Sequence, residues 1–358
     1  MSAEPLVLAP DLAGIRPGEV TARFQRDEEC QDYLLRHVSR TFALTIPELP
    51  PALGRVVSNA YLLCRIIDTV EDEAGLGLDH KAALFGAMNA VLAGQLPAHR
   101  LRERLAPEHF PGATPAEREL LHCLPRVVAI THRLSANQQQ ALRRCVAVMG
   151  QGMLEFQQQG LDGLRDMAEL ERYCYFVAGV VGEMLTELFC HHSPGIHRHR
   201  EQLLALAVPF GQGLQLTNIL KDIWEDRQRG ACWLPRNLFR GVGLDLDELH
   251  PGHHRTKFSL ALEPLIALTH TRLRQALDYT LLIPPREAGI RRFCLGAVGL
   301  AILTLRNLNA RRDFTSSQEI KVSRRVVKAT FLGSRLGARQ DWLVRGVFEL
   351  CQAGVPRL

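Results

Sequence analysis

Apolar residues recur at helical spacing along almost the whole chain after Asp27, and this periodicity constrains the fold more than any other feature of the sequence. The alternation of apolar and polar residues that marks strands is missing, as are the Asn-Gly turns that join them. The chain is therefore expected to be all-α. The predicted helices cover residues 55–72, 81–94, 115–134, 136–158, 167–190, 199–226, 258–281, 286–309 and 324–352.

No segment has the composition of a linker between domains, and the breaks that contain proline or glycine fall between predicted helices. With 358 residues, 46% of them apolar, the chain can bury a full core. We predict a loosely ordered lead over residues 1–25 and a single all-helical domain over residues 26–358.

The sequence lacks the signals of export. Its first residues include Glu4 and Asp11 and do not form the basic start and apolar run of a secretory signal. Its nine cysteines are scattered singly, which is typical of reduced structural thiols. The sequence contains no run of about 18 uninterrupted apolar residues, the pattern that predicts a membrane span. We therefore expect a cytoplasmic protein that is soluble or peripheral on the inner membrane face.

The charge balance is mildly basic, with 43 Lys and Arg residues against 38 Asp and Glu residues and a net charge of +5. This excess suits an anionic ligand or a membrane surface. It is too small to indicate nucleic acid, so no nucleic-acid partner is expected.

Two pairs of aspartates lie in apolar predicted helices, Asp68 with Asp72 and Asp222 with Asp226. Residues four apart lie on one helix face, one turn from each other. Two carboxylates placed in this way repel each other unless a cation lies between them. Mg²⁺ fits best, because it binds through a few carboxylates together with substrate phosphates. A solvated helix face would explain one such pair, but two pairs with basic neighbours favour a metal.

Polar and basic side chains accompany both aspartate pairs. Gln215 and Asn218 continue the second pair along the same helix face. Arginine forms forked hydrogen bonds with phosphate oxygens, so basic neighbours indicate a diphosphate site. These neighbours are Arg40, Arg65, Lys221, Arg227 and Arg229, for which surface charges are the alternative interpretation.

The last predicted helix mixes basic with apolar residues, including Trp342. A packed terminal helix and an amphipathic helix on a membrane surface are both consistent with this composition. The basic residues of the tail from Ile320 to Leu358 include Lys321, Arg324, Arg325, Lys328, Arg335, Arg339 and Arg345.

Four ordered motifs between about Ser39 and Lys328 resemble those of the squalene/phytoene synthase family of head-to-head prenyltransferases. They are Ser39-Arg40-Thr41-Phe42, the segment from Arg65 to Asp72, the segment from Tyr173 to Gly182, and the segment from Gln215 to Asp226 with Arg229 and Trp233-Leu234-Pro235 after it.

The resemblance implies an all-α isoprenoid synthase fold, in which a single helical domain surrounds a central active-site cavity. By the same resemblance, the Mg²⁺ ligands are Asp68, Asp72, Asp222 and Asp226, with Glu71 and Glu225 in the same metal set. The side chains that bind the substrate diphosphates are Arg40, Arg65, Lys221 and Arg229, with Gln215 and Asn218 beside them.

Phe42, Tyr173 and Phe293 match family positions that face the reacting carbons, and Arg65 belongs with them to the implied catalytic set. A leaving diphosphate must be neutralised before an allylic carbon ionises, which metals and arginines can do. The carbocation then needs a dry wall, and aromatic faces can stabilise it. The resemblance leaves two roles open for Tyr173, proton acceptor or cation stabiliser.

For the reaction, the resemblance implies condensation of two farnesyl diphosphates to presqualene diphosphate and its NADPH-dependent reduction to squalene. Phe293-Cys294 and the basic segment from Lys321 to Arg325 resemble the squalene-forming branch, which implies NADPH contacts by Lys321, Arg324 and Arg325. The spacing from Asp226 to Pro235 resembles the phytoene branch, so a phytoene- or dehydrosqualene-type synthase without reduction is the alternative. An inactive helical partner subunit is a more remote alternative. We expect a monomer.

Overall fold

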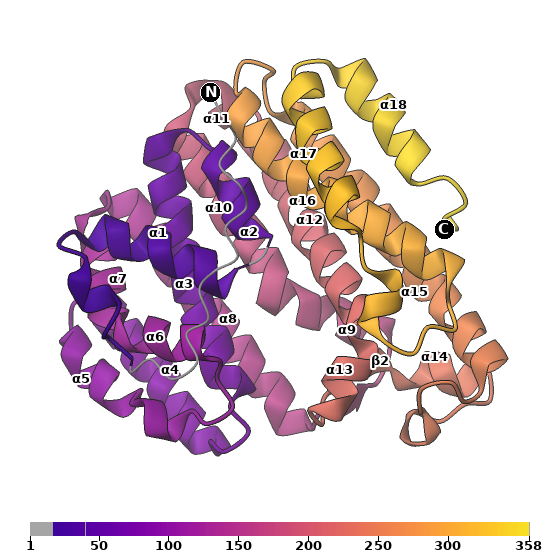
Figure 1. Ribbon diagram of the computed structural model, residues 1–358, viewed down its shortest axis with the longest axis horizontal. Coiled ribbons are helices and arrows are strands. Elements are labelled where there is room, and N and C mark those ends of the chain that lie inside the picture. The colour runs from indigo at the N-terminus through magenta and orange to yellow at the C-terminus, as the bar shows by residue number, and fades with distance from the viewer. Residues whose placement is uncertain (1–16, 40, 358) are drawn as a thin grey trace. The chain divides into compact units, whose positions relative to one another are not determined.

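The structure is a computed structural model that describes residues 17–39 and 41–357. The chain forms two compact units, one of Met1–Pro47 with Pro51–Gly150 and the other of Glu48–Pro50 with Gln151–Leu358. Both units are helical within the described residues, which confirms the all-α prediction. Figure 1 shows the helices of both units.

The helices of the first unit are mostly short, apart from the 22-residue helix that carries the first acidic motif and the 24-residue helix that continues into the second unit. They are η1 (Thr21–Arg23), α1 (Asp27–Val38), α2 (Phe42–Thr45), η2 (Ile46–Glu48), α3 (Pro51–Asp72), α4 (Leu78–Leu92), α5 (Ala98–Arg104), η3 (Pro107–His109), α6 (Pro115–His122), α7 (Leu124–Arg133) and most of α8 (Ala136–Gln159). Helix α1 packs against α3, α6 and α7.

The helix predicted over residues 115–134 is in fact two helices, because α6 ends before Cys123 and α7 begins after it. Pro125 lies in the first turn of α7. Proline has no backbone N–H and clashes with the carbonyl of the preceding turn, so it is tolerated at a helix start but interrupts a continuous helix.

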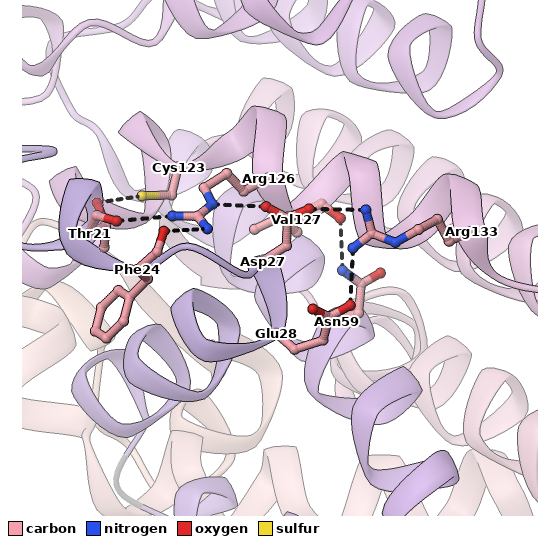
Figure 2. A network of polar contacts seen from close by, with 9 residues as sticks. All are labelled: Thr21, Phe24, Asp27, Glu28, Asn59, Cys123, Arg126, Val127 and Arg133. Carbon is pink, nitrogen blue, oxygen red and sulfur yellow. Dashed lines mark hydrogen bonds and ion pairs between the residues drawn. The ribbon is translucent and has the colours of Figure 1, made fainter.

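The segment before α1 is held by a network centred on Arg126 of α7 (Figure 2). The Arg126 guanidinium donates to the carbonyl oxygens of Thr21 and Phe24, each at 2.9 Å, and to Asp27 Oδ1 at 2.9 Å. Arg133 donates to the other oxygen of Asp27 at 3.0 Å. Burial alone would raise the pKa of Asp27, but hydrogen bonds from the two arginines outweigh it and lower that pKa.

The second unit contains the longest helix in the described part of the chain, with 28 residues. Its elements are the end of α8, β1 (Asp162–Leu164), α9 (Met167–Cys174), η4 (Tyr175–Gly179), α10 (Val180–His192), α11 (Pro194–His197), α12 (Arg200–Lys221), α13 (Ile223–Gln228), β2 (Cys232–Pro235), α14 (Arg236–Gly241), η5 (Leu246–Glu248), α15 (Arg255–Leu282), α16 (Ala288–Ala310), η6 (Ser317–Ile320), α17 (Arg324–Gly337) and α18 (Asp341–Cys351). Helices α12, α15 and α16 pack against one another (Figure 1).

Two glycines allow the backbone of α12 to lie directly against the backbone of η4 and α10. A Cβ atom on Gly182 would lie 2.2 Å from the carbonyl oxygen of Ala207, and one on Gly211 would lie 2.2 Å from that of Ala178. Any side chain at either position would force the helices apart. The glycine of the predicted segment Tyr173–Gly182 therefore fixes the packing of α12, which leads into the second acidic motif.

Two short parallel strands were not expected from the sequence. Strand β1 pairs with β2, with Asp162 opposite Cys232 and Leu164 opposite Pro235. Strands of three and four residues are too short to show the alternation by which a strand is recognised in a sequence.

The last predicted helix, 324–352, is divided into α17 and α18. Arg291 of α16 stabilises the junction, although its side chain is almost completely buried. It donates to the carbonyl oxygens of Ile283 at 2.6 Å and Leu281 at 3.0 Å, near the end of α15. It also donates to the Ala338 carbonyl oxygen at 3.0 Å and to Asp341 Oδ1 at 2.6 Å. Each acceptor offsets part of the cost of burying the guanidinium.

Three helical stretches have the length and apolar composition of a membrane span, Met167–His192, Arg200–Lys221 and Ala288–Ala310. Half or more of the residues in the most apolar window of each stretch are buried inside the protein.

Candidate active site

The first acidic motif lies on one stripe of α3. Tyr61, Arg65, Asp68 and Asp72 follow each other at spacings of four, three and four residues, which places them on one helix face. Asp72 is exposed at the end of the helix, and Asp68 is half-buried one turn before it. The predicted pairing of the two carboxylates along one face is therefore present in the structure.

Arg65 is held by Glu117 of α6, a residue that sequence reasoning missed. Glu117 closes a capping box with Thr114: its Oε2 accepts the Thr114 N–H at 2.7 Å, while the Thr114 hydroxyl accepts the Glu117 N–H. The other oxygen, Oε1, accepts a hydrogen bond from Arg65 Nη2. On its other side, Arg65 Nη1 lies 3.9 Å from Asp68 Oδ2. The capping box thus orients the arginine beside the aspartate.

The environment of Asp68 favours the protonated form of its carboxyl group. Burial raises the pKa of Asp68 to about 7, and the negative charges of Asp72 and Glu117 add to this, while Arg65 opposes it. Its side chain nevertheless keeps 31% of its exposed area, so a ligand can reach it. A hard cation next to Asp68 and Asp72 would favour the charged form of both.

A buried lysine lies behind the same motif. Lys81 of α4 donates to the Glu71 carbonyl oxygen at 2.5 Å, and burial lowers its pKa despite the opposing charges of Glu71, Asp72 and Glu73. Glu71 itself is buried. Glu73 accepts the N–H groups of Gly75 at 3.1 Å and Gly112 at 3.0 Å. Glu73 therefore organises the two loops beside the motif.

The predicted opening motif precedes α3 and contacts it. The Ser39 hydroxyl accepts the N–H groups of Phe42 at 3.0 Å and Ala43 at 3.3 Å and so starts α2. The Phe42 ring lies 5.3 Å from the ring of Tyr61, which begins the α3 stripe. Arg40 lies outside the described residues.

The second acidic motif spans a break between two helices. Asp222 ends α12 and precedes α13 with φ −102° and ψ 16°, so the helix predicted over 199–226 is interrupted there. The Asp226 N–H still donates to the Asp222 carbonyl oxygen at 2.8 Å, which preserves the one-turn spacing. The Lys221 ammonium lies 2.7 Å from Oδ1 and 2.6 Å from Oδ2 of Asp222.

The remaining predicted residues of this motif differ in exposure. Asp226 is buried and its Oδ1 accepts a hydrogen bond from Arg229, which is 63% exposed. Gln215 is half-buried and Asn218 is exposed on α12. Their side chains have no hydrogen bond to the parts of the chain that the structure describes, so both have donors and acceptors to offer a ligand.

Tyr173 lies in an aromatic cluster with Trp233, a motif residue whose contact with Tyr173 the sequence did not indicate. The two rings stack with centroids 4.0 Å apart and an angle of 11° between their planes. Phe156 meets Tyr173 edge-on at 5.2 Å. Trp233 lies on strand β2, and Tyr173 is the penultimate residue of α9, which ends at Cys174 just before the π-helical turn η4. Irregular turns of this kind are frequent at functional sites.

Phe293 and the predicted cofactor residues lie elsewhere in the second unit. Phe293 is buried on α16, and its ring meets that of Phe189 edge-on at 6.1 Å. Lys321, Arg324 and Arg325 are exposed, the last two in the first turn of α17. The structure thus groups Tyr173 with Trp233, and it packs Phe293 against Phe189.

The donor set of both motifs is suited to Mg²⁺, because it consists of carboxylates, of which those of Asp68, Asp72 and Asp222 are at least partly exposed. Within residues 17–39 and 41–357, no three His, Cys, Asp or Glu side chains are gathered closely enough to hold a metal ion. Mg²⁺ commonly completes its octahedron with water and substrate phosphate oxygens, so a pair of carboxylates is a sufficient protein contribution.

Comparison with known proteins gives one consistent result. The profile described as squalene/phytoene synthase matches residues 35–326. The squalene synthase of Eremothecium gossypii is 29% identical over 280 residues, which cover 76% of this chain and 60% of the relative. That of Candida albicans is 28% identical over 301 residues, covering 81% and 64%. The chain thus spans about three fifths of the length of these curated relatives.

Two solved structures are similar in fold. TcSQS in complex with the ligand BPH1237 has a TM-score of 0.74 and 24% identity, with 91% of each chain covered. A dehydrosqualene synthase in complex with a ligand has a TM-score of 0.62 and 18% identity, covering 87% of this chain and 95% of that one. These likenesses confirm the predicted fold class.

Proposed function

Because the chain belongs to the squalene/phytoene synthase family, matched over residues 35–326, we propose that it is a squalene synthase (farnesyl-diphosphate farnesyltransferase). It joins two farnesyl diphosphates head to head to give presqualene diphosphate, which it reduces with NADPH to squalene. The observation that carries this proposal is the pair of acidic motifs, each with at least one accessible aspartate and an adjacent cation, in a chain whose curated relatives are squalene synthases.

We assign the Mg²⁺ contacts to Asp68 and Asp72 in the first motif and to Asp222 and Asp226 in the second. Bound there, Mg²⁺ would neutralise the leaving diphosphate. The two glutamates predicted in the metal set have other contacts. Glu71 is buried near Lys81, and Glu225 accepts hydrogen bonds from Ser317. We propose that they support the aspartates without binding the metal directly.

The basic side chains next to the aspartates would bind diphosphate oxygens. Arg65 is oriented by Glu117, and Lys221 and Arg229 each lie against an aspartate of the second motif. A substrate diphosphate with its metal ions can replace these internal pairs by stronger charge-assisted hydrogen bonds. Arg40, Gln215 and Asn218 complete the proposed diphosphate contacts.

The aromatic cluster would stabilise the carbocation. The stacked rings of Tyr173 and Trp233 form a wall without strong nucleophiles, and aromatic faces attract cations. The Tyr173 hydroxyl is the polar group of this wall that can accept or return a proton. Phe42 and Phe293 are proposed to bound the reacting carbons as further aromatic surfaces.

The reduction would use the basic segment before and at the start of α17. Lys321, Arg324 and Arg325 are exposed cations that can contact the phosphates of NADPH. The binding of a dinucleotide here does not depend on a Rossmann fold, which the helical chain lacks in its described part.

We further propose that the enzyme contacts a membrane through α17 and α18. Six of the eight large apolar side chains that are most exposed lie on these helices, and Leu336, Trp342 and Leu350 are each more than 70% exposed. Residues 321–340 contain six Lys or Arg and no Asp or Glu. Apolar side chains beside unbalanced positive charge are typical of helices that bind anionic bilayers. Squalene is itself an apolar product that partitions into lipid.

A vesicle assay tests this contact. Binding to vesicles that contain anionic lipid should weaken in a Trp342→Ser, Leu350→Ser double variant and at high salt, while the reaction in detergent stays unchanged. Equal binding by wild type and the double variant would contradict the proposal. A dimer in solution that disappears in this variant would identify the surface as a contact between copies of the chain.

A product assay tests the proposed reaction. The purified protein is incubated with farnesyl diphosphate and Mg²⁺, with and without NADPH, and the lipids are identified by mass spectrometry. Squalene that forms only with NADPH, with presqualene diphosphate accumulating without it, is the expected result. Dehydrosqualene formed regardless of NADPH would assign the protein to the non-reducing alternative, and no product would favour an inactive partner subunit.

A further inference from the structure

Two consecutive residues of the second acidic motif hold the loop between α16 and α17. The Trp224 indole N–H donates to the Phe314 carbonyl oxygen at 2.8 Å, and the Trp224 ring packs against Phe258 at 5.1 Å and Phe314 at 6.4 Å. Glu225 Oε1 accepts from the Ser317 N–H at 3.0 Å and from its hydroxyl at 2.5 Å. Helix α13 therefore contacts this loop at two points three residues apart.

The loop leads directly into the basic segment. Ser317 begins η6, which ends at the fully buried Ile320, and the Ile320 carbonyl oxygen accepts from Asn307 of α16 at 3.1 Å. Lys321 follows Ile320 without an intervening residue, and Ser323 caps α17 by accepting the Val326 N–H. A shift of Ser317 would therefore move the first residues that carry the positive charge.

The contact of Glu225 is of a strong kind. The Glu225 carboxylate receives two donors on a single oxygen, and hydrogen bonds to a carboxylate are about twice as strong as those between neutral groups. This contact occupies Glu225 Oε1 with protein groups.

We propose that Glu225 is a positioning residue for residues 314–325 and thereby for NADPH. Through Ser317 it ties the basic segment to the helix that also carries Asp226, so that delivery of the hydride depends on a contact from the diphosphate-binding motif. This inference rests on the proposed reduction by NADPH. It assigns Glu225 to the second half of the reaction, whereas Asp222 and Asp226 act in both halves.

The test compares three serine variants. Ser317→Ala removes the hydroxyl donor and should lower kcat/KM for NADPH about tenfold, mostly through KM, because a hydrogen bond to a charged group is lost. Formation of presqualene diphosphate without NADPH should stay within about twofold of wild type. Ser317→Thr keeps a hydroxyl and should restore NADPH use. Ser316→Ala, one residue away and with no side-chain hydrogen bond to the described residues, is the matched control.

Hydrogen exchange provides a readout that does not need NADPH. Peptides covering residues 314–323 should exchange faster in Ser317→Ala than in Ser316→Ala, while peptides of α12 remain unchanged. Equal losses in both half-reactions would overturn the inference, because they would place the contact in metal binding. Unchanged exchange in Ser317→Ala would overturn it as well.

Failure of the proposed function can be told apart from failure of this inference. A wild-type enzyme that releases dehydrosqualene regardless of NADPH would refute the reduction and with it the cofactor role of Glu225. The exchange experiment would still decide whether Glu225 and Ser317 hold the loop.

Discussion

The two acidic motifs have the same four-residue spacing, but each obtains its neighbouring positive charge in a different way. In the first, Arg65 is bound by Glu117 from another helix and lies 3.9 Å from Asp68. In the second, the ammonium of Lys221 contacts both oxygens of the adjacent Asp222. The first motif therefore depends on a tertiary contact, whereas the second is balanced by its own chain neighbours.

Two motifs with the same sequence spacing can therefore differ in how the charge of their aspartates is balanced before a ligand binds. Burial leaves Asp68 with a raised pKa of about 7, so the first motif gains most from an incoming cation. The second motif must exchange an internal ion pair for the metal. The four-residue spacing of the aspartates thus predicts that both motifs bind the same type of ligand, but it does not predict the free-energy cost of binding that ligand.

The largest effect is expected when an aspartate of either motif loses its charge. Asp68→Asn and Asp222→Asn should each lower the rate of diphosphate release by about 10²–10³-fold, because transition-state charge loses its metal contact. Rates are measured as diphosphate release from farnesyl diphosphate, and far-UV circular dichroism should show unchanged helicity. Asp79→Asn, an exposed aspartate of α4, is the control. Normal turnover in either variant would contradict the metal assignment for that motif.

A smaller effect should follow from removing the tertiary support of the first motif. Glu117→Gln weakens both the capping box and the hydrogen bond to Arg65, and should lower the free energy of unfolding by about 1–3 kcal/mol. It should also raise KM for farnesyl diphosphate, because Arg65 loses its orientation. Urea denaturation and steady-state kinetics measure the two effects. Glu103→Gln, which disrupts an exposed pair with Arg100, is the matched substitution and should change neither quantity measurably.

The pH dependence of stability should also distinguish the motifs. Asp68 binds its proton more tightly in the folded state, so its contribution to stability is complete below about pH 4 and is lost as the pH rises through about 7. In the absence of Mg²⁺, Asp68→Asn should therefore gain stability relative to wild type as the pH rises over this range. Urea unfolding at several pH values measures the difference. A constant difference would mean that Asp68 does not have a raised pKa.

The smallest effect on stability is expected for the cation of the second motif. Arg229→Ala removes an ion pair whose arginine is 63% exposed, so the free energy of unfolding should fall by less than about 1 kcal/mol. Binding of farnesyl diphosphate should nevertheless weaken. A loss of stability as large as that of Glu117→Gln would show that the second motif is not balanced by exposed neighbours alone.

The sequence predicted the helices well because their apolar periodicity extends over many residues. It did not predict the interruptions at Cys123, at Asp222 and between α17 and α18, where the apolar pattern continues through the break. The two strands also escaped prediction, since pairs of three- and four-residue strands depend on contacts between distant segments. Apolar periodicity indicates which face of a helix is buried, but it does not indicate where the helix is interrupted.

The candidate site was predictable where motif residues are neighbours in sequence. The partners that orient them were not, because Glu117 lies 52 residues from Arg65 and Ser317 lies 92 residues from Glu225. Trp233 was part of a recognised motif, but its stacking on Tyr173 required the fold. A capping box can be read from Thr114 and Glu117, yet nothing in the sequence says that the same glutamate binds an arginine.

The buried Arg291 makes the end of the chain indispensable to the stability of the second unit. A chain cut after Gly337 would lose the Ala338 carbonyl and the Asp341 carboxylate, and a permanent positive charge would remain in the interior with half of its acceptors removed. Because several apolar side chains of α18 are exposed, this helix could be taken for a segment that can be removed without loss of stability. Proteolytic removal of α18 should instead unfold the helices around Arg291. The surface proposed to contact the membrane is therefore coupled to the stability of the core through Arg291.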